Sequence, residues 1–354
     1  MNVPTLPGVI ARMITTESIT TRVLVSGPDG GIPVLFLHGN ASSATWWEET
    51  MLALPPQFRG IALDQRGFGD ADYDKKVDAS RGAGDWADDA VALLDALEIA
   101  QVHVVGNSLG GVVVWRLLAD YPQRLLTATV VDTGSPYGFG GTRDVDGTPC
   151  YPDFAGSGGG LSNPELVERL AGQDRSMDSR FSPRLALRML LVKPPFIPPR
   201  EENLLSAMFT THLGPQDNPG DFVVSPNWPF VAPGLWGAAN ALSPKYTGDV
   251  ARLIAAQPKL PVLWVRGSHD LAVSDAAASD PGVLGKLGVI PGWPGDAIYP
   301  PQPMLGQTRK VLQRYAAAGG WYQEVVIQDA GHVPFIEKPD EFSSALSAHL
   351  EGNR

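Results

Sequence analysis

The chain has 354 residues, of which 44% are hydrophobic and 18% are charged, so it can bury a large core in one or two domains. Its net charge of −11 argues against binding to nucleic acid or anionic membranes, whose phosphates attract Lys and Arg. The single cysteine, Cys150, excludes an intramolecular disulfide and hence a disulfide-built secreted scaffold. Residues 1–16 lack an apolar signal-peptide core, so we expect a cytoplasmic protein that does not enter a membrane.

Short apolar strands alternate with helices in the first part of the chain. Fully apolar strands separated by helices are typical of a parallel sheet that helices cover on both faces. The sequence predicts strands over 19–25, 33–37, 61–63, 102–105 and 128–131, and helices over 85–97 and 112–119. We therefore expect an α/β core that includes residues 1–133.

A different pattern follows Asp132. Prolines are dense from 194 to 233, and no apolar strand of the earlier kind occurs before Tyr246. Pro164 favours a helix start, because proline suits the first helical position. Further short helices are predicted over 183–191 and 201–209. We interpret residues 134–245 as an inserted helical cap.

The sheet pattern resumes in residues 246–354, which complete the predicted core. Here the sequence predicts helices over 250–256 and 341–350 and strands over 261–265 and 322–327. Residues 273–303 are rich in Gly and Pro and form a second insertion, which we expect to lack regular secondary structure. Long loops of this kind in compact domains are usually functional.

The segment Gly106-Asn107-Ser108-Leu109-Gly110 matches the pattern G-x-S-x-G between a predicted strand and a predicted helix. A sharp strand-to-helix turn lifts the serine hydroxyl out of the sheet, and the flanking glycines avoid collisions there. The helix N-terminus adds a positive dipole beside a developing oxyanion. The pattern predicts that Ser108 is a nucleophile.

A serine nucleophile needs a base and an orienting carboxylate. Of the six histidines, only His332 directly follows the last predicted strand, which places it at the same sheet edge as Ser108. Asp270 lies at the end of the preceding strand, and Asp132 at the end of the strand after the nucleophile. Both can reach the histidine in this architecture; we favour Asp270 and keep Asp132 as the alternative acid.

The oxyanion needs two backbone donors. One is expected to be the N–H of Leu109, the residue after the nucleophile. The other is expected from the loop after His38-Gly39, at Asn40, because Gly39 permits a close approach. No His/Cys cluster with metal-ligand spacing occurs, so we expect no metal and no organic cofactor.

These motifs together resemble the α/β-hydrolase superfamily, in the branch that carries a cap after the sixth strand. The resemblance covers about residues 19–126 and 246–350, and it implies a mostly parallel eight-stranded sheet with helices on both faces. It rests on five segments in order: His38-Gly39-Asn40, Asp64-Gln65-Arg66-Gly67-Phe68-Gly69, the Ser108 turn, Gly267-x-x-Asp270, and Gly331-His332-x-Pro334-Phe335-Ile336-Glu337-Lys338-Pro339.

Departures from relatives narrow the chemistry that the resemblance implies. Haloalkane dehalogenases and epoxide hydrolases use aspartate at the position of Ser108, so their reactions are not expected here. Carbon–carbon hydrolases of aromatic degradation share the Gly-Asn-Ser-x-Gly-Gly turn of residues 106–111, but they usually place Trp where this chain has Val333. The 62-residue gap from Asp270 to His332 exceeds the usual gap of about thirty, and the insertion at 273–303 accounts for the excess.

We therefore expect a cofactor-independent serine esterase or lactonase that cleaves a small-molecule carboxylic ester or lactone through an acyl-enzyme. Two alternatives stay open: a carbon–carbon bond hydrolase of the meta-cleavage type, and a low-turnover ligand receptor on the same fold. Aromatic and apolar residues of the insertions favour a hydrophobic or aromatic substrate. The residues expected to bind it are Trp47, Phe139, Trp236 and Val333. The oligomeric state stays open.

Overall fold

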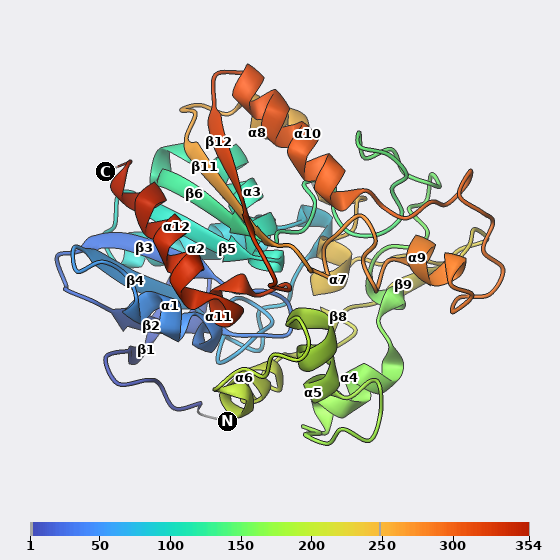
Figure 1. Cartoon of the computed structure of the whole chain (residues 1–354), viewed down its shortest axis with the longest axis horizontal. Coiled ribbons are helices and arrows are strands. Elements are labelled where there is room, and N and C mark those ends of the chain that lie inside the picture. The colour runs from blue at the N-terminus through green and yellow to red at the C-terminus, as the bar shows by residue number, and fades with distance from the viewer. Residues whose placement is uncertain (1–2, 248, 354) are drawn as a thin grey trace.

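A computed structural model describes residues 3–247 and 249–353 and has an eight-stranded sheet at its centre (Figure 1). The sheet order is β1-β2-β4-β3-β5-β6-β11-β12. All neighbours from β4 to β12 pair in parallel, whereas β2 pairs antiparallel with both β1 and β4. The expected mostly parallel eight-stranded sheet is thereby confirmed. The strands are β1 (Ile10–Thr15), β2 (Thr20–Ser26), β3 (Ile32–Leu37), β4 (Phe58–Leu63), β5 (Val102–Asn107), β6 (Leu125–Val131), β11 (Pro261–Gly267) and β12 (Trp321–Ile327).

Helices cover both faces of this sheet. In β5, Val104 packs into the apolar cluster on one face and Val105 into the cluster on the other, which explains why the strand is apolar throughout. One face carries α2 (Gly84–Ala96), α3 (Leu109–Asp120), α8 (Val250–Ala255) and α10 (Met304–Ala317). The other carries α1 (Glu48–Leu52), α11 (Pro334–Glu337) and α12 (Pro339–Glu351). Short 3₁₀ turns lie at Ala44–Trp47, Ala79–Arg81, Pro122–Arg124 and Gly159–Leu161.

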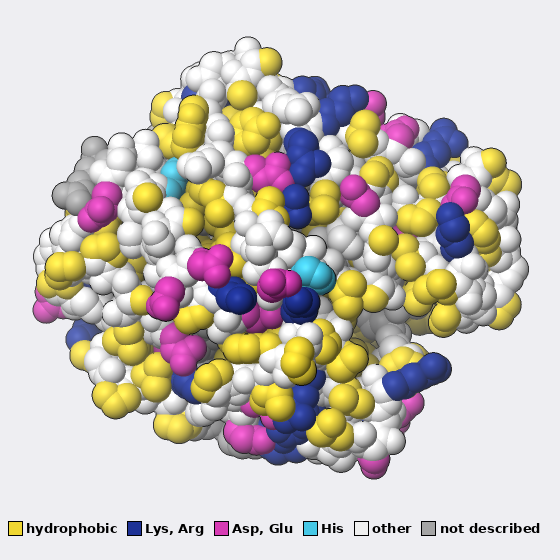
Figure 2. All heavy atoms as spheres, viewed as in Figure 1, with side chains coloured by type: hydrophobic (Ala, Val, Ile, Leu, Met, Phe, Trp, Pro, Cys, Tyr) yellow, Lys and Arg dark blue, Asp and Glu magenta, His cyan; other side chains and the backbone are white. Residues whose placement is uncertain are grey.

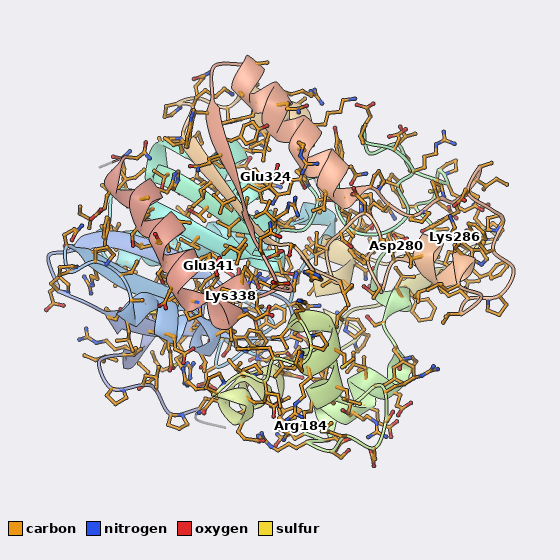
Figure 3. All side chains as sticks on the ribbon, viewed as in Figure 1. Arg184, Asp280, Lys286, Glu324, Lys338 and Glu341 are labelled. Carbon is orange, nitrogen blue, oxygen red and sulfur yellow. The ribbon has the colours of Figure 1, made fainter. Side chains whose placement is uncertain are left out.

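The cap is only partly helical, which corrects the expectation for residues 134–245. Asn163 accepts the Glu165 N–H and caps α4 (Pro164–Ala171), the helix that begins at the predicted proline. Arg184, which is labelled in Figure 3, forms an ion pair with Glu201 and so joins α5 (Pro183–Ala186) to α6 (Glu201–Met208). A π-helix, η5 (Leu187–Leu191), follows α5 directly. The remaining cap elements are the strands β7 (Leu213–Gly214), β8 (Asn218–Pro219), β9 (Phe222–Val224) and β10 (Val231–Pro233), and the helix α7 (Ala238–Ala241).

The second insertion packs against part of the cap and forms a side lobe, which we define as residues 138–160, 222–233 and 273–303. The second insertion contains the short helix α9 (Pro281–Lys286), so the expectation that residues 273–303 lack regular secondary structure is wrong. The buried Tyr299 hydroxyl donates to Gly156 O at 3.0 Å, and Trp228 Nε1 donates to Pro291 O at 2.9 Å. The lobe lies to the right in Figure 1, and Figure 2 shows the surface hollowed between it and the helical part of the cap.

None of the helices in the described ranges is long and apolar enough to cross a membrane.

Candidate active site

Five candidate residues lie at the carboxyl ends of five neighbouring parallel strands. Asn40, Ser108, Asp132, Asp270 and His332 follow β3, β5, β6, β11 and β12, respectively. In a parallel sheet these ends share one edge, and ligand sites form there. The sheet topology thus brings together residues that span almost three hundred positions of the chain.

Ser108 occupies a strained turn between β5 and α3. Its φ of 55° and ψ of −114° are disfavoured for a residue with a side chain and cost on the order of 1–3 kcal/mol. A side chain at Gly106 would stand 2.2 Å from the Gly110 carbonyl oxygen, and one at Gly110 would stand 2.1 Å from the Leu37 oxygen. Only glycine fits at both positions, so the sequence pattern forces this turn and presents the half-buried Ser108 hydroxyl above the sheet edge.

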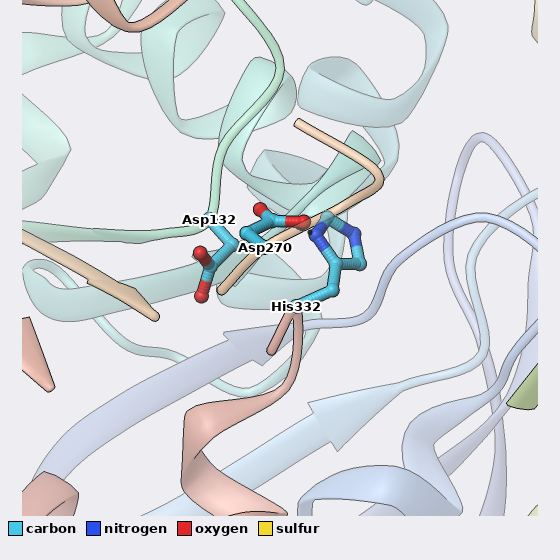
Figure 4. A group of neighbouring side chains, drawn as sticks. All are labelled: Asp132, Asp270 and His332. Carbon is cyan, nitrogen blue, oxygen red and sulfur yellow. Dashed lines mark hydrogen bonds and ion pairs between the residues drawn. The ribbon is translucent and has the colours of Figure 1, made fainter. Parts of the chain in front are cut away.

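His332 faces Asp270. The ring nitrogen Nδ1 lies 2.9 Å from Asp270 Oδ2, and both side chains are buried (Figure 4). The other oxygen, Asp270 Oδ1, accepts the backbone N–H groups of Ala272 at 2.7 Å and Val273 at 3.0 Å. Because the carboxylate accepts, Nδ1 carries the ring proton and Nε2 is free to act as a base.

Asp132 lies behind this pair and does not bond to the histidine. Its Oδ1 accepts the Gly267 N–H at 2.9 Å, whereas Oδ2 is buried without a hydrogen-bond partner. Burial, together with the nearby Asp270 carboxylate, raises the pKa of Asp132 well above its usual range. Of the two candidate acids, the structure therefore brings Asp270 to the histidine and leaves Asp132 as a buried neighbour.

Asp132, Asp270 and His332 lie close enough together that they can be tested as ligands of a metal ion. One ligating atom from each of Asp132, Asp270 and His332 lies within 4.8 Å of the others, within the described part of the chain. However, the direct bond between His332 and Asp270 occupies the atoms that would face an ion. The donor set fits a hydrogen-bonded base and acid better than a metal site.

The two expected oxyanion donors are available. Within residues 3–247 and 249–353, neither the Leu109 N–H nor the Asn40 N–H has an acceptor in the protein. A side chain at Gly39 would stand 3.2 Å from Ser108 Cβ, so the loop that carries Asn40 passes close to Ser108. No hydrogen bond joins Ser108 Oγ to His332 in this described chain; such bonds are often long in unliganded enzymes.

His38 fixes the loop that carries Asn40 through hydrogen bonds with Gln65. Its Nε2 accepts the Gln65 N–H at 3.0 Å, and Gln65 Nε2 donates to the His38 carbonyl at 2.7 Å. Burial lowers the pKa of His38 to about 4, so the ring stays neutral at pH 7. Gln65 was not predicted as a functional residue, although its place in the Asp64–Gly69 motif was a signal for it.

Asn107 is a second residue that sequence reasoning missed. Its Nδ2 donates to the carbonyl oxygens of Val131 and His332, both at 3.1 Å. It thereby joins the Ser108 turn to the loop that carries His332. Its position directly before Ser108 in the motif could have indicated this role.

The four expected substrate-binding residues do not gather at one surface. Trp47 is fully buried and stacks on Phe335 with ring centroids 4.1 Å apart, and Val333 is buried in the same apolar cluster. Neither side chain therefore reaches a surface in this structure, and the predicted substrate contact by Trp47 and Val333 has no support from their packing. Phe139 packs in the side lobe, and the half-buried Trp236 forms a backbone bridge with Asp78. The direction of each side chain depends on long-range packing that the sequence did not reveal.

Comparison with known proteins agrees with this architecture. Residues 32–148 match the family model of the alpha/beta hydrolase fold. Together with the sheet order and the turn that carries Ser108, this match shows that the chain has the α/β-hydrolase fold. The crystal structure of carboxylesterase CesB from Bacillus subtilis superposes with a TM-score of 0.60 at 18% identity, covering 98% of this chain and 93% of that one, which shows a shared fold.

Two relatives are similar over part of their sequences. The chain is 34% identical to 2-hydroxymuconate semialdehyde hydrolase of Pseudomonas sp. (strain CF600) over 44% of this chain and 54% of that protein. It is 37% identical to rhodomycin D methylesterase of Streptomyces sp. (strain C5) over 38% of this chain and 44% of that protein. The chain spans about half the length of the curated relatives it matches.

Proposed function

We propose that this protein is a serine hydrolase that cleaves a carboxylic ester or lactone of a hydrophobic or aromatic small molecule. The observation that carries the proposal is the strained Ser108 turn at the sheet edge shared with the bonded pair His332–Asp270. The unsatisfied N–H groups of Leu109 and Asn40 support it, because an acyl transfer reaction needs two such donors.

In this proposal His332 Nε2 takes the Ser108 hydroxyl proton while Oγ forms a bond to the substrate carbonyl carbon. The carbonyl oxygen becomes an oxyanion held by the amides of Leu109 and Asn40. The tetrahedral species then expels the alcohol oxygen, which receives the proton from His332, and the acyl group remains on Ser108. A water molecule, deprotonated by His332, then attacks the acyl carbon. The second tetrahedral species expels Ser108 Oγ, which takes the proton back from His332, and the acid is released. Asp270 holds the ring and stabilises its charged form throughout.

Hydrolysis of short and aromatic p-nitrophenyl esters and of aryl lactones tests this proposal, with Ser108→Ala as the matched variant. We expect turnover by wild type and a loss of at least about 10³-fold in Ser108→Ala. Labelling of wild type, but not of Ser108→Ala, by a fluorophosphonate probe gives a second readout. If both proteins are equally inert on every ester and lactone and neither is labelled, the proposal is refuted.

The second candidate is hydrolysis of a carbon–carbon bond next to a carbonyl group. The observation that favours it is the 34% identity to 2-hydroxymuconate semialdehyde hydrolase over 159 residues. A panel of vinylogous diketones, assayed beside the esters, discriminates the two. Faster cleavage of a diketone than of any ester would make the second candidate the better one.

A further inference from the structure

The cap contacts the loop of the proposed base directly. Residues 191–193, which we call the cap strap, leave the π-helix η5 and run beside this loop. The His332 N–H donates to Leu191 O at 2.8 Å. The cap therefore supplies one of the backbone bonds that hold the base, although it lies more than a hundred residues earlier in the chain.

Glu337, at the end of α11, joins the same two segments with one carboxylate. Its Oε1 accepts the Gly331 N–H from the base loop, and its Oε2 accepts the Lys193 N–H from the cap strap, both at 2.7 Å. The side chain is only 7% exposed. Bonds from backbone N–H groups to a buried carboxylate are short and strong, so this contact fixes the distance between strap and loop.

Gly331 allows the strap to approach this closely. A side chain at this position would stand 2.9 Å from both Leu191 O and Lys193 N. The φ of Gly331 does not lie in the left-handed region, so glycine is needed here for space and not for backbone conformation. The junction is thus built from both sides, by a carboxylate that draws the segments together and a glycine that leaves room.

A second contact at this junction is an exposed ion pair. Lys193 Nζ lies 2.7 Å from Asp329 Oδ1, and the Asp329 side chain is 66% exposed. Exposed ion pairs of this kind contribute little to stability. Removal of this pair therefore provides a control that changes a charge at the same junction without touching the buried bonds.

From this geometry we infer that Glu337 is a positioning residue that couples the cap to the base. When the strap is bound, Glu337 and Leu191 hold the backbone at Gly331 and His332, and Asn107 holds the His332 carbonyl, so the ring remains directed at Asp270. When the strap moves away, the Leu191 bond to His332 is lost, and Glu337 loses the Lys193 N–H that helps to orient its carboxylate toward Gly331. The inference rests on the proposed function, because it concerns how well His332 serves Ser108.

The test compares Glu337→Gln with Asp329→Asn in the full chain. Glutamine keeps the size of the side chain but turns an amide NH₂ toward one of the two backbone N–H groups. We expect kcat for a p-nitrophenyl ester to fall about 100-fold with KM within about twofold, because misplacement of a catalytic group by about 1 Å has an effect of this size. Asp329→Asn should keep kcat within about twofold. Thermal unfolding of each variant verifies that it is folded.

A double-variant cycle separates positioning from a general structural effect. If Glu337 acts through His332, then Glu337→Gln should cause no further loss in a His332→Ala background. A full second loss there, or a Glu337→Gln kcat equal to that of Asp329→Asn, would overturn the inference. Absence of turnover and of fluorophosphonate labelling in wild type would instead refute the proposed function.

Gly331→Ala supplies an independent variant in case Glu337→Gln does not fold. It retains every hydrogen-bonding group and the Glu337 carboxylate but wedges the strap away from the base loop. We expect a comparable loss of kcat with little change in KM. Wild-type kcat in this variant would show that contact between strap and loop does not position His332 and would overturn the inference.

Discussion

Replacement of Asp270 by asparagine should almost abolish activity for a reason that its hydrogen bonds define. Asp270 Oδ1 accepts two backbone N–H groups, from Ala272 and Val273. In Asp270→Asn the amide oxygen must keep this position, because an NH₂ group there would face two donors. The amide NH₂ then points at His332 Nδ1, where the carboxylate oxygen lies 2.9 Å away in wild type.

This arrangement forces the wrong tautomer on the histidine. Nδ1 has to accept from the amide, so Nε2 carries the proton and cannot take one from Ser108. In serine hydrolase triads such a change lowers kcat by about 10⁴-fold, or about 5.5 kcal/mol of transition-state stabilisation. The fold should persist, since the substitution keeps the volume and both backbone bonds.

Asp132→Asn is the matched control, because the two acids are buried side by side. Burial and the nearby Asp270 carboxylate raise the pKa of Asp132 and so disfavour its charged form, which makes a neutral amide a milder change here than at Asp270. Its oxygen can still accept the Gly267 N–H. We expect less than about a tenfold loss of kcat in p-nitrophenyl ester hydrolysis. A deeper loss in Asp132→Asn than in Asp270→Asn would refute the reasoning and make Asp132 the acid.

Three further predictions concern stability and the nucleophile turn. Burial raises the pKa of Asp280 to about 6 from 3.8. The protonated form therefore stabilises the fold below about pH 4, and this contribution is lost as the pH rises through about 6. Asp280→Asn should gain about 3 kcal/mol in unfolding free energy relative to wild type between pH 4 and pH 8, and a pH-independent difference in denaturant titrations would contradict this. Gly106→Ala places a methyl group 2.2 Å from the Gly110 oxygen, so fluorophosphonate labelling should slow by at least about 100-fold, and unchanged labelling would show that the turn is not rigid. Glu48 is fully buried, and its Oε2 lies 2.7 Å from Arg200 Nη2 of the cap. Glu48→Ala should therefore lower the unfolding free energy by about 2 kcal/mol. A loss below about 0.5 kcal/mol would mean that this pair does not hold the cap.

The elements that position the site follow from rules that act locally. Ser108, Asp270 and His332 each come directly after an apolar strand, and parallel strands place their carboxyl ends at one edge. The sequence favoured Asp270 but did not exclude Asp132 as the acid, because the two residues follow neighbouring strands. Backbone contacts with residues 272 and 273 orient Asp270, and these contacts appear only once the loop has folded.

The features that the sequence did not predict correctly depend on long-range packing. Trp47 suggested a substrate contact but stacks in the core, because its direction is set by Phe335 near the other end of the chain. The helix α10 is absent from the elements that the sequence predicts. Its buried positions recur with helical spacing, but they include the polar Gln307, which forms hydrogen bonds with Ser135 and Thr142 of the cap segment 134–245. A pattern of apolar residues alone does not reveal a helix whose buried face is partly polar.

The cap contacts both halves of the candidate site, which bears on how such a protein can change its substrate. Asn218 of the cap donates to the Asn40 side chain in the oxyanion loop, and Leu191 of the cap accepts from His332 in the base loop. A cap that only covered the site could be exchanged freely, with effects confined to KM. A cap that also restrains both loops cannot move or change without altering kcat, so substitutions that reshape its substrate-facing surface should be tolerated best where they leave residues 191–193 and Asn218 in place.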